Sequence, residues 1–228
     1  MSIIAVPIAS PASTSLLTMI TGLVKDSSGA LTPSDFDMAL SNALARYSKD
    51  RPRVMVADIP GAGVREYDLP QGFIDGLSVL DAVEYPAGLI PEQVLDSGDW
   101  QLYRSPFGIK FRLIGWVPAF GETIRVRFTT GHDGATVPDP DAPAVAQLAA
   151  SDCCRRLAQI YGQTSDPSIM ADSVNYRSKG DEFARRAKEL EGLYRAHIGV
   201  KEGDTTPAAC VTASPQRSRR GRLTHRRA

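Results

Sequence analysis

The chain has 228 residues, which is enough for one or two domains with a sizeable hydrophobic core. Hydrophobic residues make up 43% and charged residues 23% of the chain, and no stretch approaches the roughly 20 apolar residues of a membrane span, which argues against a membrane protein. The formal net charge of zero hides an asymmetry, because residues 200–228 carry a net charge of +5 and residues 1–199 a net charge of −5.

The first region, residues 1–52, has a helical period. Between residues 13 and 25 the apolar residues recur every three or four positions, as Leu16, Leu17, Ile20, Leu23 and Val24. A second helix begins at Thr32-Pro33-Ser34-Asp35, where a hydroxyl cap, a proline and an acid occur together, and its pattern ends at Pro52. Its apolar face consists of Phe36, Leu40, Ala43, Leu44 and Tyr47. These residues predict a helical hairpin.

The second region, residues 53–135, changes to a period of two. Short runs of β-forming residues lie between turn signals, at residues 54–59, 65–69, 77–85, 100–103, 109–114 and 123–129. Ser105-Pro106-Phe107-Gly108 is flanked by two of these runs, as in a hairpin. In the last run Ile124, Val126 and Phe128 alternate with arginines. We expect a small antiparallel sandwich or barrel.

The third region, residues 136–199, returns to a helical period. Asp141 is the expected cap of an alanine-rich helix that covers residues 144–161, and small side chains allow such a helix to pack on more than one side. Its expected polar strip contains Gln147, Ser151, Asp152, Arg155, Arg156 and Gln159. The last helix has a stripe of mostly apolar residues at alternating steps of four and three and ends at Gly199. This stripe consists of Tyr176, Gly180, Phe183, Ala187, Leu190, Tyr194 and His197.

Together the three regions predict an α+β fold, in which a small antiparallel β domain is inserted into a four-helix bundle core. The bundle consists of an N-terminal hairpin in residues 1–52 and a C-terminal hairpin in residues 136–199. We expect residues 200–228 to form an extended basic C-terminal tail, or arm.

The search for catalytic residues finds almost none. His132, His197 and His225 lie far apart in the sequence, which does not fit a histidine-based metal or nucleophile site. His132 and Asp133 could form a base and acid pair of a small hydrolase, but a turn histidine fits the surrounding sequence better. The Gly61-Ala62-Gly63 sequence lacks a third glycine and a following helix, so we interpret it as a tight turn.

Metal and redox chemistry are not indicated either. Asp139 and Asp141 alternate with prolines, which favours a rigid linker over a metal-binding loop. Cys153 and Cys154 are adjacent in a helical pattern and are expected to be small core residues, and Cys210 lies in the tail. We therefore expect no enzyme activity, no metal and no cofactor. The residues MSIIAVPIAS lack the basic start of a signal peptide, so we expect synthesis in the cytoplasm.

The last twelve residues contain six arginines, no acid and a single leucine. Such a segment has almost nothing to bury, so we expect it to gain structure by binding something outside the fold. The planar guanidinium group binds carboxylates with two parallel hydrogen bonds, which suits an acidic protein surface. Arginines also neutralise phosphates, so the alternative is a DNA-binding accessory protein. Because the tail has no aromatic residues for base stacking, its DNA contacts would be independent of sequence.

Several segments occur in an order that resembles a family of head–tail adaptor (connector) proteins of tailed bacteriophages. The resemblance covers about residues 13–199. It is carried by the helix end ARYSKDRPR at residues 45–53, YDLPQGF at 67–73, VEYP at 83–86, RFTTGH at 127–132, LAA at 148–150 and ADSVNY at 171–176. Compact members of this family have only the helical bundle, so the β-rich insertion is a departure from the pattern.

This resemblance implies a structural virion protein that forms a homo-oligomeric ring, usually of twelve copies, beneath the portal protein. One face of the ring meets the portal, the other receives a stopper or tail-terminator protein, and the genomic DNA passes through the centre. The C-terminal segment, here residues 200–228, reaches onto the portal. The resemblance places the protein in the neck of the virion, after assembly in the host cytoplasm. The expected portal-binding residues are Arg217, Arg219, Arg220, Arg222, Leu223, Arg226 and Arg227.

Overall fold

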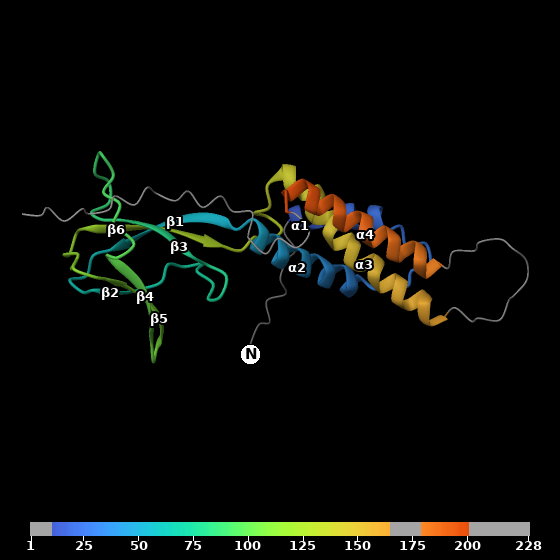
Figure 1. Ribbon diagram of the computed structural model, residues 1–228, viewed down its shortest axis with the longest axis horizontal. Coiled ribbons are helices and arrows are strands. Elements are labelled where there is room, and N and C mark those ends of the chain that lie inside the picture. Colours follow the sequence, from blue (N-terminus) through green and yellow to red (C-terminus); the bar gives the residue numbers. More distant parts are fainter. Residues whose placement is uncertain (1–10, 165–178, 201–228) are drawn as a thin grey trace, which may run out of the picture. The chain divides into compact units, whose positions relative to one another are not determined.

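A computed structural model describes residues 11–164 and 179–200 of the chain (Figure 1). In these residues the fold is α+β, as predicted, with four helices and two small antiparallel sheets. The elements in chain order are α1 (Pro11–Val24), α2 (Pro33–Asp50), β1 (Arg53–Pro60), β2 (Glu66–Asp68), β3 (Leu80–Glu84), β4 (Trp100–Ser105), β5 (Gly108–Leu113), β6 (Thr123–Thr130), a 3-10 turn η1 (Asp139–Asp141), α3 (Ala142–Thr164) and α4 (Lys179–Ile198).

The described residues fall into two compact units. The helical unit contains residues 11–55, 72–79, 128–164 and 179–200, and the β unit contains residues 56–71 and 80–127. No helix in either unit is long and apolar enough to cross a membrane.

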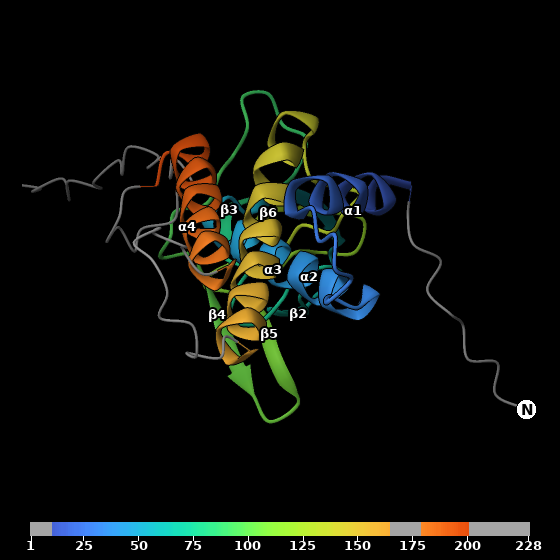
Figure 2. The ribbon, with the colours of Figure 1, turned by 90° about the vertical axis from the view of Figure 1, so that its right-hand side faces the viewer.

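Helix α3 is the centre of the helical unit. It packs against α1, α2 and α4, and Figure 2 shows it between α4 and the other two. The alanine-rich sequence explains this position, because small side chains let three neighbouring helices approach one axis. Cys153, Cys154 and Leu157 are completely buried on α3, which confirms that both cysteines are core residues. Burial raises the pKa of Cys153 to about 12, so its thiol stays protonated.

The predicted polar strip of α3 is wrong at Ser151. This side chain is completely buried, and among the described residues its hydroxyl has no hydrogen-bond partner. The physical reason is that α1, α2 and α4 together cover most of the circumference of α3, so part of the polar strip lies in the core. Asp152, Arg155, Arg156 and Gln159 retain exposed or half-buried positions.

The start of α2 is stabilised as the sequence predicts. The backbone N–H and the hydroxyl of Thr32 both donate to Oδ2 of Asp35, over 2.9 and 2.7 Å. Arg156 on α3 donates to the other carboxylate oxygen of Asp35, which joins the start of α2 to the middle of α3. Helix α2 ends at Asp50, directly before Arg51 and Pro52.

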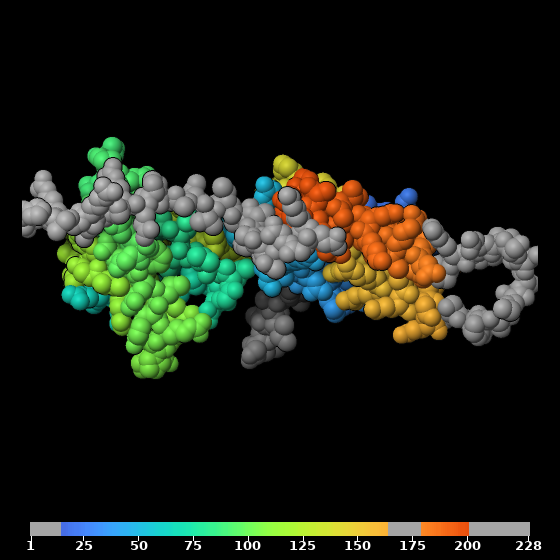
Figure 3. All heavy atoms as spheres, in the orientation of Figure 1, coloured from blue at the N-terminus to red at the C-terminus, as the bar shows by residue number. Residues whose placement is uncertain are grey.

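The apolar stripe of α4 is confirmed from Gly180 to Tyr194, but the prediction is wrong at His197, which is exposed while the next residue, Ile198, is buried. Tyr176 lies outside the described residues. Ala187, Leu190 and Tyr194 are buried against α3, and the two helices lie side by side along their length (Figure 3). A methyl group at Gly180 would lie 3.2 Å from the carbonyl oxygen of Ala158, so this glycine permits a close approach of the two helices. The helix ends at Ile198, and Gly199 follows with φ of +79°, as expected for a helix-ending glycine.

The β strands form two three-stranded sheets with the orders β1-β6-β3 and β2-β5-β4. The predicted hairpin is present, because β4 and β5 pair antiparallel from Trp100 opposite Leu113 to Ser105 opposite Gly108. Only Pro106 and Phe107 remain as the turn. This hairpin projects from the rest of the β unit (Figure 3).

The alternation along β6 is also confirmed. Ile124, Val126 and Phe128 are completely buried, and the arginines between them lie on the other face. There Arg125 donates to both carboxylate oxygens of Asp58 on β1, and Arg127 donates to Asp81 on β3.

The two valines of β1 lie on its exposed face and not in the core. Val54 and Val56 are 59% and 55% exposed, because they lie on the face of β1 that is not covered, where every second residue of the strand is exposed. The following turn is tight, as predicted: Gly61 donates its N–H to the carbonyl of Glu122, and a methyl group at Gly61 would lie only 2.2 Å from the carbonyl oxygen of Ala119.

Candidate functional site: a polar junction at the end of α2

The sequence-predicted binding residues of the arm, Arg217 to Arg227, lie outside the described residues. Within the described residues, the structure brings together a different set of functional candidates. They surround the carboxylate of Asp141, which closes the 3-10 turn directly before α3.

Asp141 is the centre of a buried polar junction in the helical unit. Its side chain is only 4% exposed, and three side chains from two other helical segments bind it. The hydroxyl of Tyr47 donates to Oδ2 over 2.5 Å, and Nη1 of Arg51 donates to the same oxygen over 2.7 Å. On the other side, Nε2 of His197 lies 2.9 Å from Oδ1. The junction therefore joins the end of α2, the start of α3 and the end of α4.

The electrostatics of this junction favour a charged Asp141. Burial alone would raise the pKa of its carboxyl, but the hydrogen bonds from Tyr47, His197 and Arg51 outweigh burial and hold the pKa below its ordinary value. Burial and the bond to Asp141 raise the pKa of Tyr47, so its phenol stays protonated and remains a donor. The ionised acid and its donors form a stable arrangement at neutral pH.

Segments that carry the family resemblance meet beside this junction. Oγ of Ser48 accepts the backbone N–H of His132 over 2.8 Å, and the rings of Tyr47 and His132 lie 4.9 Å apart. The hydroxyl of Thr130 donates to the carbonyl of Gly72 over 2.6 Å. Thus residues of the segments 45–53, 67–73 and 127–132, distant in sequence, lie together in the helical unit.

The polar atoms of the His132–Asp133 pair hold their own loop together. Nδ1 of His132 lies 3.0 Å from the carbonyl oxygen of Thr136. Oδ1 of Asp133 accepts the backbone N–H groups of Ala135 and Thr136, both over 2.9 Å. These contacts are those of a turn, which supports the structural interpretation of His132 over its use as a catalytic base.

A pocket of about 450 Å³ opens beside the junction. It is lined by Tyr47, Arg51, Pro52, Arg53, His132, Pro138, Pro140 and Asp141. The buried acid in this pocket already has hydrogen-bond partners within the chain. In residues 11–164 and 179–200, no group of three or more histidine, cysteine, aspartate or glutamate side chains could hold a metal ion.

A second acidic centre, Glu191 on α4, binds arginines from three helices. Arg46 of α2 donates to Oε1 over 3.2 Å, Arg195 of α4 donates to the same oxygen over 2.6 Å, and Arg155 of α3 donates to Oε2. The hydrogen bonds and charges of these arginines lower the pKa of Glu191 against the effect of burial. Sequence reasoning missed this residue, although its position four residues after the buried Ala187 places it at the edge of the apolar stripe.

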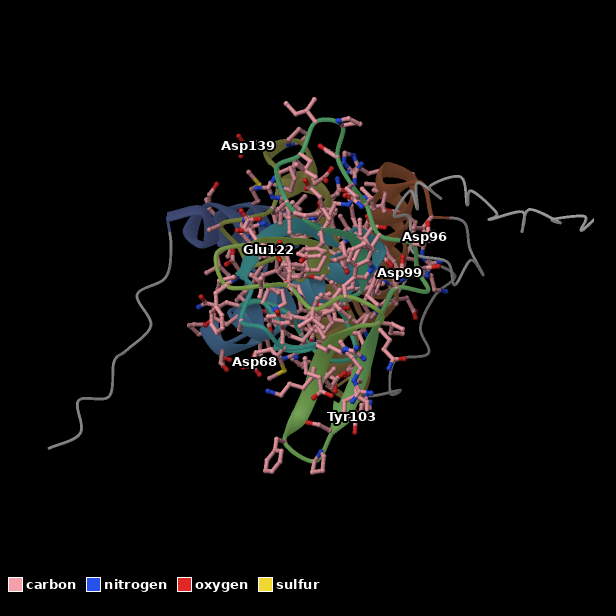
Figure 4. The ribbon with its side chains drawn as sticks, turned by 90° about the vertical axis from the view of Figure 1, so that its left-hand side faces the viewer. Asp68, Asp96, Asp99, Tyr103, Glu122 and Asp139 are labelled. Carbon is pink, nitrogen blue, oxygen red and sulfur yellow. The ribbon has the colours of Figure 1, made fainter. Side chains whose placement is uncertain are left out.

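The β unit presents separate polar surfaces. Figure 4 shows Tyr103 on the β4–β5 hairpin and the acids Asp96 and Asp99 in the segment that leads into β4. The guanidinium group of Arg112 lies 3.7 Å from the centre of the Tyr103 ring. The hydroxyl of Tyr85 donates a hydrogen bond to Glu122. Burial and this hydrogen bond raise the pKa of Tyr85 to about 12.

No family model and no curated protein matches the chain. Among solved structures, this protein is similar to a chain in the neck of an empty GTA particle computed with C6 symmetry. The two chains are 16% identical, the match covers 77% of this chain and 92% of that chain, and the TM-score is 0.28. A chain in the neck of the native GTA particle computed with C12 symmetry shares 18% identity, with 77% and 91% covered and a TM-score of 0.28. A chain in the virion of the native gene transfer agent (GTA) shares 16% identity, with 79% and 92% covered and a TM-score of 0.29.

Proposed function

We propose that this protein is a structural, non-enzymatic component of the neck of a phage-like virion, a head–tail adaptor that forms a ring between the portal and the stopper or tail-terminator protein. The observation that carries this proposal is the convergence of the resembling segments. Residues of the segments 45–53 and 127–132 are separated by up to 87 positions in the sequence, yet Ser48 binds His132 next to the Tyr47–Asp141 pair. Thr130 of the last segment also binds Gly72 of the segment 67–73.

The convergence supports the proposal because residues that carry the resemblance have structural roles at this junction. Arg51 and Tyr47 of the first segment hold Asp141, and Ser48 of the same segment holds the loop of His132. A family that retains these segments would retain the same junction between α2, α3 and α4. We propose that the four helices form the bundle of a ring subunit, with the β unit as an addition to it.

Exposed apolar side chains support an assembly of many copies. Ile90 and Phe107 are 100% and 94% exposed in loops of the β unit, and Phe120 is 83% exposed there. On α4, Leu193 is 54% exposed. Ring subunits bury such groups in heterologous contacts, in which two different faces of neighbouring copies meet.

We propose that the arm, residues 200–228, binds acidic grooves of the portal. The arginines at positions 217, 219, 220, 222, 226 and 227 would form paired hydrogen bonds with carboxylates, and Leu223 would add the one large apolar contact. Such an arm acquires structure through its partner, at the expense of some binding free energy.

The direct test is to image the purified protein alone and in intact particles by electron microscopy, and to measure its binding to portal rings. We expect rings, located at the neck, that bind the portal. Replacement of all six arm arginines by alanine should abolish portal binding and leave ring formation unchanged. Replacement of the same six by lysine is the matched control, which keeps the charge but loses the planar fork and should weaken binding less. A protein that stays monomeric and does not bind portal rings would refute the proposal.

The arginine-rich arm also supports a second candidate, a DNA-binding accessory protein. If all six arginines contacted phosphates, the logarithm of duplex affinity would fall with the logarithm of salt concentration with a slope of about −5. Strong duplex binding with this slope, lost in the alanine variant, together with absence from the neck would favour this second function.

A further inference from the structure

Helix α1 and helix α3 leave an apolar groove between them in the helical unit. The groove has a volume of about 320 Å³ and is lined by Thr18, Met19, Gly22, Leu23, Pro143, Ala146 and Gln147. On α1 the lining residues recur at steps of three and four, and the same holds on α3, so the groove follows the line along which the two helices face each other. Thr18 and Gln147 contribute its polar side chains.

The groove exists because side chains are missing where the helices face each other. Gly22 has no side chain, and a methyl group placed there would meet nothing within 4 Å. Ala146 is completely buried but short, and Met19 remains partly exposed beside them. The result is an apolar surface that the described residues do not fill.

A second pocket lies on the other side of Met19. It has a volume of about 300 Å³ and is lined by Ser15, Leu16, Met19, Gly134, Val137, Asp139 and Ala142. The two pockets share Met19, so together they extend along α1 from Ser15 to Leu23. At 1.5 Å per residue this length is about 12 Å.

The segment that precedes α1 has matching chemistry. Residues 3–8 read Ile-Ile-Ala-Val-Pro-Ile, without a charged or polar side chain. Exposure of several large aliphatic side chains in a row to water is unfavourable, at about 25 cal/mol for each Å². A short uncharged segment of this kind fits an apolar groove better than the other parts of the chain outside the described residues, since residues 165–178 include charged and polar side chains and the arm is strongly basic.

The segment also reaches the groove. Gly22 lies eleven residues after Pro11, about 16 Å along the helix. An extended chain that turns back at Pro11 covers this length in about five residues, which brings Val6 level with Gly22. The segment is therefore long enough to reach the groove of its own chain.

We propose that residues 3–8 fold back along α1 and fill the groove between α1 and α3 of the same chain. The segment would then complete the core of the helical unit on its exposed side. This inference is independent of the proposed function, because it concerns how a single chain covers its own apolar surface.

The first experiment measures the protection of one introduced thiol. Val6→Cys is made in the full chain with Cys210→Ser, while the buried Cys153 and Cys154 are left in place. In the native protein we expect the thiol at position 6 to react with a maleimide at least about tenfold more slowly than in urea, which corresponds to about 1.4 kcal/mol of burial.

Gly22→Leu, added to this background, should abolish the protection, because a Cβ at position 22 meets nothing within 4 Å and the rest of the leucine side chain would take up space in the groove. Leucine also favours a helix more than glycine does. The matched control is Gly192→Leu on α4, where an added Cβ also meets nothing within 4 Å. The control should leave the protection unchanged. Equal reaction rates with and without Gly22→Leu would overturn the proposal.

The second experiment identifies whose segment occupies the groove. Val6→Cys combined with Gly22→Cys should form a disulfide within one chain on mild oxidation, visible as a cross-linked peptide from the monomer band. Val6→Cys combined with Gly192→Cys should not. A cross-link found only in covalent dimers would mean that the segment of a second copy fills the groove, and it would refute the proposal in its present form.

Discussion

The phenolic oxygen of Tyr47 lies 2.5 Å from Oδ2 of Asp141, and this hydrogen bond joins two residues that are 94 positions apart. Both side chains are buried. A hydrogen bond to a charged, buried acceptor contributes more than a neutral one, about 1.5–3 kcal/mol. The pair therefore fixes the end of α2 to the start of α3, and its contribution is a large part of the free energy of unfolding of a small domain.

Tyr47→Phe should lower the free energy of unfolding by about 1.5–3 kcal/mol, because the ring still fills its space but the bond to Asp141 is lost. The matched control is Tyr161→Phe, whose hydroxyl lies 2.6 Å from the exposed Ser28. Its effect should be under about 1 kcal/mol. Urea unfolding followed by circular dichroism measures both, and equal effects would contradict the importance of the junction.

Asp141→Asn should lower the free energy of unfolding by about 3 kcal/mol at neutral pH, because three donors lose their charged acceptor. The pKa of Asp141 is lower in the folded protein than its ordinary value of 3.8, so its contribution is present above pH 3.8 and is lost as the pH falls through the folded pKa. The difference between variant and wild type should therefore shrink below pH 3.8.

Asp139→Asn is the control for this pH dependence. Asp139 is exposed and only two residues away, so we expect a change within about 0.5 kcal/mol. A difference between Asp141→Asn and wild type that stays constant down to pH 2 would show that the charge of Asp141 contributes nothing.

Two buried serines on neighbouring helices should respond in opposite directions. Ser151→Ala removes a buried hydroxyl without a partner among the described residues and should raise the free energy of unfolding by about 0.5–1 kcal/mol. Ser48→Ala removes the acceptor of the His132 N–H and should lower it by about 1–2 kcal/mol. Thermal and urea unfolding distinguish the two, and a loss of stability in Ser151→Ala would reveal a partner for its hydroxyl.

The stripe of α4 can be tested with two leucines three residues apart. Leu190 is 6% exposed, so Leu190→Ala should cost roughly 2–5 kcal/mol. Leu193 is 54% exposed, so Leu193→Ala should change stability by less than about 0.5 kcal/mol. Similar losses in both variants would mean that α4 is buried on two sides, as in a ring contact, and the concentration dependence of unfolding would then detect it.

Signals that act within a few residues were predictable from the sequence. Thr32 and Asp35 mark the start of α2, Gly199 marks the end of α4, and Pro106 and Phe107 mark the hairpin turn. Each of these features depends on the local backbone, so the residue type at one or two positions determines it.

Features that depend on distant neighbours were not predictable. Ser151 and Glu191 belong to charged or polar faces when each helix is considered alone, and only the packing of α3 against three helices buries them. Asp141 was expected to cap a helix, but the partners of its carboxylate come from α2 and from the end of α4. The valines of β1 show the same limit, because the period of a strand does not tell which of its faces is covered.

Gly180 has a consequence for the rotation of α4 about its own axis. Rotation would bring the side chain of a neighbouring residue into the space beside the carbonyl of Ala158, where even a methyl group would lie within 3.2 Å of the oxygen. At the other end, the bond of 2.6 Å from Tyr194 to Asp50 fixes the same helix. Two contacts about 20 Å apart thus set the direction in which the charged face of α4 points, and every copy of the protein presents this face at the same angle to whatever it meets.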